Sequence, residues 1–558
     1  MDYSKHLNVN ETPQAEPIPG SAQVANRAGG FAWALDDWGR LHRFLILGTE
    51  GGTYYITERT LTLENAAAVQ RCIQADGARA VQIITEVSEA GRAPKNDPAV
   101  FALAMCVAFG DVVTKQVALG ALPRVCRIGT HLFHFLKFYE ALRPHGKRWG
   151  RQLRRAVGAW YQRPIETVAG QAIKYVQRDG WSHNDALQLA HPKPPTIQHR
   201  ALFRYITRPG SPVDGLPELV EAVERLKTAT DPKEIIRTIR DHRLPREAIE
   251  TANTEWLKRA DVWEALLDHM PMEAMIRNLG VMTNRGLLAP LSHAAGLVVA
   301  RLADEQMLRK ARIHPIRVLA ALLTYRGGES RGGVAWTPVT NVVDALDAAF
   351  YRAFGYVIPS GKRLMLALDV SGSMTVGDVA GVRGLTPRAA AAAMALVTAA
   401  VEPNHFITGF FTGEASKKPY GGQHGAYGGR FGADWQSGIA VLAISPKQRL
   451  DDVIAQTDNL PFGGTDCALP MLYALANNIP VDGFVILTDN ETWAGGIHPA
   501  QALAKYREAM GIPAALVVVG MVSNGFTVAD PKDPGMLDVV GFDLATPQFI
   551  SDFVGGMQ

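Results

Sequence analysis

The sequence predicts two domains, a long α-helical repeat domain followed by a doubly wound α/β domain. The chain has 558 residues, which is more than one hydrophobic core usually supports. From Leu63 to Phe350, apolar residues recur with helical spacing in segments separated by Gly, Pro, Asn or Asp. From Leu364 onward, short apolar runs alternate with helical segments, a pattern typical of a parallel sheet covered by helices.

The N-terminal part of the chain differs from both domains. The first 28 residues are polar and contain proline, so we expect a flexible N-terminal arm. Residues 30–56 are rich in Trp, Phe and Tyr, with Gly51 and Gly52 between two pieces that favour β-structure, so we expect a small strand or hairpin there. The predicted parts are 1–28 for the arm, 29–358 for the helical domain and 359–558 for the α/β domain.

The helical segments are short and joined by short links, which indicates stacked helix pairs rather than one bundle. Residue-level self-similarity is weak, so irregular HEAT-like repeats fit better than tetratricopeptide or ankyrin units. Such an α-solenoid offers an extended curved surface to extended partners. The expected helices include Glu64–Gln74, Ala78–Ala90, Pro98–Phe109, Thr130–Leu142, Pro217–Thr228, Pro232–Arg240, Arg246–Leu257, Ala260–Leu267, Ile316–Leu323 and Thr340–Phe354.

Oxygen-bearing side chains follow two apolar strands of the predicted α/β domain. The strand 364–369 ends in an acid and is followed by two serines at alternate positions, and the strand 485–489 also ends in an acid. Ligands bind beyond the carboxyl ends of parallel strands, and hard oxygen donors suit Mg²⁺. With a threonine before the helix predicted at 467–476, the order resembles the metal-ion-dependent adhesion site of von Willebrand A domains. The expected ligands are Asp369, Ser371, Ser373, Thr465 and Asp489.

An alternative is that each acid merely caps the helix that follows it, but five ordered oxygen residues at strand ends rarely coincide. Five oxygens from the chain leave one position of an octahedral Mg²⁺ for water or a partner's oxygen. Two acids with three hydroxyls favour capture of a partner carboxylate over catalysis. No nucleophile elbow, Walker lysine loop, HExxH or kinase motif is visible, so we expect that the protein is not an enzyme.

Basic charge gathers in the helical domain. Residues 361–558 hold 12 Lys and Arg against 18 Asp and Glu, which leaves 45 against 36 for residues 1–360. Between Ala121 and Arg163, ten cations accompany one acid, and His, Trp and Tyr lie among them. Phosphates attract clustered cations and exposed bases stack on aromatic planes, so RNA binding is favoured over an ordinary solvated face. The expected contacts there include Arg124, Arg127, Lys137, Lys147, Arg148, Arg151, Arg154 and Arg155.

A second candidate lies at 173–191. Lys174 and Arg178 are four residues apart, so we expect them to share a helix face, where they repel unless a phosphate bridges them. Gly180 breaks this helix, and Ser182 with Asp185 fits a capping box that starts the next one.

The sequence shows no targeting or membrane segment, and its cysteines form no recognisable motif. The N-terminus lacks the apolar core of a signal peptide, and the longest apolar run, 389–401, is too short to cross a bilayer. The four cysteines are scattered without a C-x-x-C pair, which favours reduced, buried thiols in a cytoplasmic protein.

Four stretches occurring in order carry a wider resemblance: 43–55, the Gly-Trp-Ser-His stretch at 180–183, the Gly-Gly-Thr-Asp stretch at 463–466, and the metal pattern. The chain from about residue 28 resembles the TROVE-domain family, which comprises the Ro ribonucleoprotein autoantigen and its bacterial Ro sixty-related relatives. The resemblance implies a closed ring of HEAT-like repeats joined to a von Willebrand A domain. It also implies that Y RNA binds on the outer ring surface and that single-stranded ends of misfolded RNA enter the central hole.

The same resemblance implies roles for single residues and partners. It places Y RNA contacts on Lys174, Arg178 and His191, whereas a capping or structural role is as plausible for His183. It implies a monomer that acts in RNA quality control or decay with an exoribonuclease as partner. The alternative is a metal-dependent protein-interaction scaffold, of adhesion or chelatase type, that binds no RNA.

Overall fold

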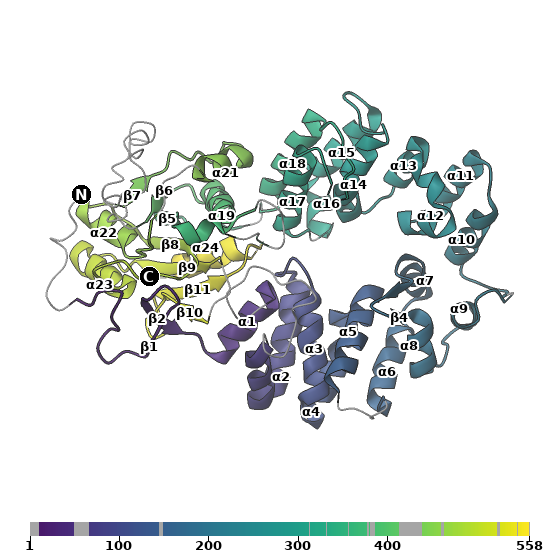
Figure 1. The fold of residues 1–558 in the computed structure, drawn as a ribbon, viewed down its shortest axis with the longest axis horizontal. Helices are drawn as coiled ribbons and strands as arrows, with labels where there is room; N and C mark the ends of the chain where they lie inside the picture. The colour runs from purple at the N-terminus through teal and green to yellow at the C-terminus, as the bar shows by residue number, and fades with distance from the viewer. Residues whose placement is uncertain are drawn as a thin grey trace.

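The structure is a computed structural model that describes the chain except residues 1–10, 49–65, 144–148, 212, 312, 331, 355–356, 377–378, 380–384, 412–437, 459–462, 522–524, 544 and 557–558. Its helical part is a succession of short helices (Figure 1). They are α1 (Asp37–Leu47), α2 (Ala67–Ala90), α3 (Asp97–Phe109), α4 (Val112–Val125), α5 (Gly129–Leu142), α6 (Arg151–Trp160), α7 (Ile165–Lys174), α8 (His183–Ala190), α9 (Ile197–Thr207), α10 (Glu218–Thr228), α11 (Pro232–His242), α12 (Arg246–Ala252), α13 (Ala260–Leu267), α14 (Met272–Asn284), α15 (His293–Ala303), α16 (Glu305–Ala311), α17 (Pro315–Arg326) and α18 (Thr340–Arg352).

These helices confirm the predicted helical pattern, with two differences of detail. The segments expected at 64–74 and 78–90 form one helix over the described residues, α2, which begins at Ala67 and bends where Asp76 has non-helical backbone angles. The segment expected at 246–257 ends instead at Ala252, because the Asn253 side chain caps a separate 3₁₀ turn, Thr254–Lys258. Apolar periodicity therefore predicts where helices lie better than where they break.

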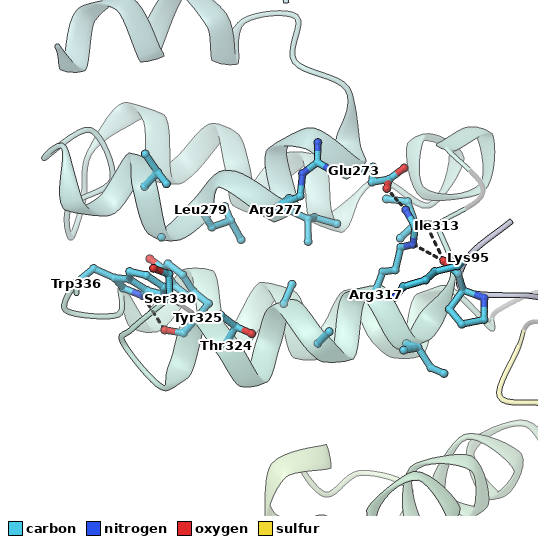
Figure 2. A pocket seen from close by; sticks show the side chains of 17 residues that line it. Lys95, Glu273, Arg277, Leu279, Ile313, Arg317, Thr324, Tyr325, Ser330 and Trp336 are labelled. Carbon is cyan, nitrogen blue, oxygen red and sulfur yellow. Dashed lines mark hydrogen bonds and ion pairs between the residues drawn. The ribbon is translucent and has the colours of Figure 1, made fainter. Parts of the chain in front are cut away.

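The helical chain runs out from the α/β domain and returns to it, so that its two ends meet (Figure 1). His314, just before α17, lies with Nε2 3.1 Å from the Arg92 carbonyl oxygen. Arg317 donates to the Pro94 carbonyl at 2.6 Å and also pairs with Glu273 of α14. Figure 2 shows this junction beside a cavity of about 460 Å³ between α14 and α17. The helices thus close into the expected ring.

The α/β domain is built on one six-stranded sheet of order β11-β9-β8-β5-β6-β7, parallel except for the edge strand β7. The sequences of its strands are continuous apolar runs because helices cover both faces of the sheet. The strands are β5 (Leu364–Asp369), β6 (His405–Phe410), β7 (Ile439–Val441), β8 (Gly483–Thr488), β9 (Ala515–Gly520) and β11 (Met536–Val540). The helices are α19 (Pro387–Val401), α21 (Leu450–Asp458), α22 (Leu469–Ala476), α23 (Pro499–Met510) and α24 (Thr546–Gly556).

Alternate residues of the strands sort onto the two faces of this sheet. Leu364, Leu366 and Leu368 pack in the core that contains α19, α21 and α24, and this core continues into the second half of the helical ring. Met365 and Ala367 pack in a separate core with α22 and α23. The period of two in a strand therefore places one face against the ring and leaves the other to the domain itself.

The flexible arm expected at 1–28 is wrong over residues 11–28, and residues 1–10 lie outside the described chain. Gln14 is fully buried, and Thr12 and Asn26 are also buried. Strand β1 (Gln23–Ala25) pairs with β2 (Phe31–Ala34), which also pairs with β10 (Phe526–Thr527) of the α/β domain. A polar segment is ordered here because another part of the chain satisfies its hydrogen bonds.

Among the described residues, the strand or hairpin expected at 30–56 is correct only at β2. Residues 37–47 form α1, because the Asp36 side chain accepts a hydrogen bond from Gly39 N at 2.7 Å and Gly48 ends the helix with φ 85°. Its apolar run 44–47 is buried on all sides, so it lacks the periodicity that distinguishes a helix from a strand. The part at 49–56 lies outside the described residues.

Candidate metal centre and nucleic-acid interface

The structure brings four of the expected metal ligands together at the carboxyl ends of β5 and β8. Asp369 ends β5, and its Oδ1 accepts from Ser371 N at 2.9 Å while its Oδ2 accepts from the Thr488 hydroxyl at 2.6 Å. The hydroxyls of Ser371 and Ser373 lie 3.1 Å apart. Ser373 also hydrogen-bonds to Asp489, which directly follows β8. The neighbouring parallel strands therefore deliver both carboxylates to one point.

Thr465 lies on a loop that touches both of these strand ends. Gly372 N donates to the Gly463 carbonyl at 3.4 Å, which links this loop to the serine turn. The Thr465 carbonyl accepts from Trp493 N and Ala494 N, both at 3.1 Å, which links it to the segment after Asp489. The loop that carries the fifth expected ligand thus lies beside the segments that carry the other four.

Burial makes this cluster electrostatically unfavourable without a cation. Asp369, Ser371, Thr465 and Asp489 are buried, whereas Ser373 is exposed and opens the cluster to solvent. Burial raises the pKa of Asp369 to about 7, and the charge of Asp489 adds to this rise. Burial also raises the pKa of Asp489. Two buried carboxylates with three hydroxyls form a hard-oxygen set that a divalent cation such as Mg²⁺ would neutralise.

The sequence analysis did not include Arg388, whose side chain supports the backbone of this site. The side chain lies at the start of α19 and is buried, and it donates to the carbonyls of Val370 and of Ser371, the latter at 3.2 Å. It also reaches the Thr457 carbonyl at 3.4 Å. A buried guanidinium that satisfies backbone carbonyls fixes the turn that carries the serine ligands. A lone arginine in an otherwise apolar helix was the signal for it.

The basic segment 121–163 is less cationic in the fold than in the sequence. Acids distant in sequence approach it: Glu89 pairs with Arg124 at 2.6 Å, and Asp179 lies 3.5 Å from Lys137. Arg127 donates to Ser88 at 3.0 Å and to carbonyl oxygens. These three expected RNA contacts therefore have structural partners.

Arg151, Arg154 and Arg155 of α6 remain as RNA-binding candidates. The structure records no ion pair for them within the part of the chain it describes, and Arg151 and Arg155 are exposed while Arg154 is half-buried. Lys147 and Arg148 lie outside the described residues. The first turns of α6 thus offer cations to solvent.

Three aromatic side chains of the same segment are not stacking platforms, contrary to the expectation. Trp149, Trp160 and Tyr161 are buried. The Trp160 indole donates to the Cys126 carbonyl at 2.6 Å, and the Arg163 guanidinium lies 3.8 Å from its ring centroid. These rings fill the core between helices, so any binding here depends on charge rather than on base stacking.

Lys174 and Arg178 do not share a helix face, contrary to the expectation. Helix α7 ends at Lys174, and Arg178 lies in the short strand β3 (Gln177–Arg178), which pairs with β4 (Trp181–Ser182). Arg178 is exposed and Lys174 is half-buried. The hairpin leads into α8, where the predicted capping box of Ser182 and Asp185 is present. Lys174 thus ends a helix, whereas Arg178 lies in the strand that follows it.

His191 lies at the other end of α8 from this hairpin. It ends the helix in the left-handed conformation, with φ 47°, and it is exposed. Eight helical residues separate it from the hairpin, which corresponds to about 12 Å. Gln162, just after α6, donates to the Lys193 carbonyl at 2.9 Å. The segment that contains His191 therefore lies beside the C-terminal end of α6. The candidate RNA surface therefore spans α6, the hairpin and the end of α8.

His183 has a structural role. Its Nδ1 lies 2.8 Å from the Tyr161 hydroxyl, and its Nε2 lies 3.3 Å from the Gln171 carbonyl. The side chain is buried, and this burial lowers its pKa to about 4. It therefore remains neutral and joins α7 to α8.

Buried histidines make the stability of the protein depend on pH. Burial lowers the pKa of both His183 and His314 to about 4, whereas an unfolded histidine titrates near 6.5. The unfolded state binds more protons between these values, so stability is fully present above pH 6.5 and is lost as pH falls toward 4. We expect protonation of each histidine to lower the free energy of unfolding by about 2 kcal/mol between pH 7.5 and pH 5. Urea denaturation at both pH values measures this.

The variants His183→Asn and His191→Asn separate this effect from general acid sensitivity. His183→Asn should reduce the loss of stability between pH 7.5 and 5, whereas the exposed His191→Asn should leave it unchanged. An equal pH dependence in the wild type and His183→Asn contradicts the assignment.

Comparisons with known proteins match both domains of the fold. The TROVE domain matches residues 24–332 and the Ro60 vWA domain matches residues 363–554. The chain belongs to the TROVE-domain family of Ro proteins. It is 39% identical over 556 residues to the RNA-binding protein RO60 of Deinococcus radiodurans, covering 99% of this chain and 98% of the relative. It is 34% identical to the RNA-binding protein RO60 of Caenorhabditis elegans, covering 96% and 90%.

A solved structure is also similar to this Ro-family chain. The crystal structure of the Deinococcus radiodurans RO (RSR) protein matches with a TM-score of 0.70 and 38% identity, covering 94% of this chain and all of that one. The predicted fold class, a helical ring followed by a von Willebrand A-type domain, is confirmed. Among the described residues, no helix combines the length and apolarity needed to span a membrane.

Proposed function

We propose that this Ro-family protein is a non-catalytic RNA-binding protein. The observation that carries the proposal is the full-length similarity of ring and α/β domain to relatives that are named RNA-binding proteins. The exposed cations of α6 and of the β3–β4 hairpin support it, because cations clustered on a surface attract a polyanion.

The RNA partners proposed are Y RNA and single-stranded ends of misfolded RNA. Y RNA contacts the ring through Lys174, Arg178 and His191, with the α6 arginines extending the same surface. Single-stranded ends enter the centre of the ring. The protein acts in RNA quality control or decay in the cytoplasm, as a monomer, and a partner exoribonuclease removes the RNA.

The metal site serves a protein partner in this proposal. Asp369, Ser371, Ser373, Thr465 and Asp489 hold a divalent cation, and their hard oxygen donors suit Mg²⁺. When bound, the ion supplies a positive charge that attracts an acidic oxygen ligand. Ser373 is the exposed ligand, so a partner's carboxylate approaches from its side. Buried Arg388 keeps the serine turn in place while the partner docks.

Salt dependence of RNA affinity tests the proposal. If about five cations neutralise phosphates, the logarithm of affinity should fall with the logarithm of salt concentration with a slope of about −3 or steeper. Filter binding of a single-stranded RNA between 50 and 300 mM KCl measures this slope, and sequencing of RNA that co-purifies with the chain identifies the partner. No co-purifying RNA together with a flat salt response would favour the alternative, a metal-dependent protein scaffold.

A further inference from the structure

The N-terminal segment, residues 11–30, lies across the α/β domain and forms what we call the N-terminal strap (Figure 1). Its first part is anchored on α23 by an ion pair of 2.5 Å between Glu11 and Lys505. Further along, the Asn26 side chain donates to the Thr492 carbonyl at 2.6 Å, and Arg27 N and Ala28 N donate to the Glu491 carboxylate at 3.0 and 3.1 Å. The strap thus binds the segment that begins two residues after Asp489.

Gln14 is the centre of these contacts. The side chain is fully buried, and its amide nitrogen donates to Asp466 Oδ1 at 2.7 Å and to the Ile497 carbonyl at 2.9 Å. Its amide oxygen accepts from the Thr492 hydroxyl. The Gln14 amide therefore uses both of its N–H donors and its carbonyl, a complete set for a buried amide.

These bonds connect two loops that carry metal ligands. Asp466 directly follows Thr465, and Thr492 lies three residues after Asp489. The Thr492 hydroxyl also accepts from Cys467 N at 3.2 Å, so one hydrogen-bond chain runs from Gln14 through Thr492 to the Thr465 loop. Both loops are thus held by one side chain of the strap.

Two glycines show how closely the strap is fitted. A Cβ added to Gly30 would lie 2.0 Å from the Thr492 carbonyl oxygen, and one added to Gly495 would lie 2.3 Å from the Gln14 amide nitrogen and 2.4 Å from Asp466 Oδ1. Neither approach leaves room for a side chain. The strap and the two loops therefore pack as one unit.

We propose that Gln14 is a positioning residue for the metal site, which holds the Thr465 and Asp489 loops in the geometry that binds the cation. The inference rests on the proposed metal site and adds to it a residue some 450 positions away in sequence from the loops. Groups that orient metal ligands change metal affinity by about 10- to 100-fold when they are removed.

The test uses the full-length chain with Gln14→Met, which keeps the side-chain volume and removes the amide. Isothermal titration with Mg²⁺ and electron paramagnetic resonance with Mn²⁺ should show affinity at least about tenfold weaker than the wild type. Hydrogen exchange at residues 489–494 should be faster in the same variant. Unchanged metal affinity in a folded Gln14→Met protein overturns the proposal.

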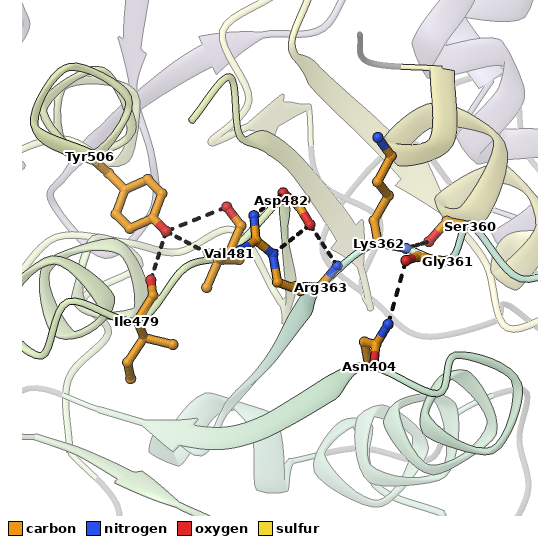
Figure 3. Close-up of polar contacts among 9 residues, drawn as sticks. All are labelled: Ser360, Gly361, Lys362, Arg363, Asn404, Ile479, Val481, Asp482 and Tyr506. Atoms are coloured by element: carbon orange, nitrogen blue, oxygen red, sulfur yellow. Dashed lines mark hydrogen bonds and ion pairs between the residues drawn. The ribbon is translucent and has the colours of Figure 1, made fainter. Parts of the chain in front are cut away.

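Tyr506→Phe is a matched control, because it removes a buried hydroxyl from the opposite edge of the same sheet. Figure 3 shows the Tyr506 hydroxyl accepting from Val481 N at 2.6 Å and donating to the Ile479 carbonyl at 2.7 Å. Its metal affinity should stay within about twofold of the wild type. Equal weakening in both variants would assign the effect to general destabilisation and overturn the positioning role.

If Gln14→Met does not fold, Asn26→Ala provides the test with the same criteria, since it removes a single strap-to-loop side chain. Absence of metal binding in the wild type would mean that the proposed metal site itself fails, and the positioning role with it. Metal binding in the wild type with unchanged affinity in the strap variants would overturn the positioning role alone.

Discussion

Asp369→Ala is expected to abolish binding of divalent cations while RNA affinity stays within about threefold of the wild type. Asp369 is the fully buried carboxylate at the end of β5, and its two oxygens contact Ser371 N and the Thr488 hydroxyl. A hydroxyl-rich site with one remaining acid, Asp489, lacks the charge to hold Mg²⁺. The candidate RNA surface belongs to the ring, so it keeps its own cations. Titration with Mn²⁺ and filter binding of RNA measure the two affinities separately.

Asp482→Asn is the control for this prediction. Asp482 lies just before β8, at the opposite edge of the sheet, where it pairs with Arg363 at 2.6 Å (Figure 3). Its removal should leave metal binding unchanged, because it is no ligand. A large loss of RNA affinity in a correctly folded Asp369→Ala protein would show that the two sites are coupled. This would contradict the proposal that the ring binds RNA and the α/β domain binds the metal independently.

The clustering of the oxygen-bearing residues was predictable because most of them lie at the ends of strands that the sequence reveals. An apolar run that ends in an acid defines a buried parallel strand, and parallel strands bring their carboxyl ends to one edge. Asp369 and Asp489 are 120 positions apart, yet this rule alone places them together. Thr465 was found by its place before a helix rather than by any strand.

The residues that hold the loops of the candidate site in place could not be predicted by such rules. Gln14 belongs to a polar segment without periodicity, and its partners Asp466 and Thr492 lie more than 450 positions away. Burial of this amide depends on tertiary contacts that complete its hydrogen bonds. Composition alone therefore indicated a mobile arm where the fold has a fixed strap.

Counting charges along the chain overestimated the basic surface for a related reason. Glu89 precedes the basic segment and Asp179 follows it, but the fold brings them to Arg124 and Lys137. Stacked helices place residues about one repeat apart side by side. Net charge in a sequence window is therefore a poor guide to the charge of a solenoid face, and α6 retains the cations because no such acid reaches it in the described structure.

The double variant Lys174→Ala, Arg178→Ala is expected to weaken RNA binding by about ten- to a hundredfold at 100 mM salt. Arg178 is exposed in β3 and Lys174 ends α7, so neither change opens a cavity in the core. Each lost phosphate contact removes about 0.7 from the salt slope for a single strand, so the slope should become shallower by about 1.4. Filter binding over a range of KCl concentrations measures both quantities.

Lys233→Ala, Arg237→Ala provides a matched control, because these exposed cations are also four residues apart and lie on α11, elsewhere in the ring (Figure 1). Non-specific attraction between a basic ring and RNA would make the two double variants lose affinity equally, since each removes two charges. Site-specific binding at the hairpin would spare the α11 variant. Equal losses would therefore contradict a defined RNA surface at α6 to α8, even if the ring binds RNA.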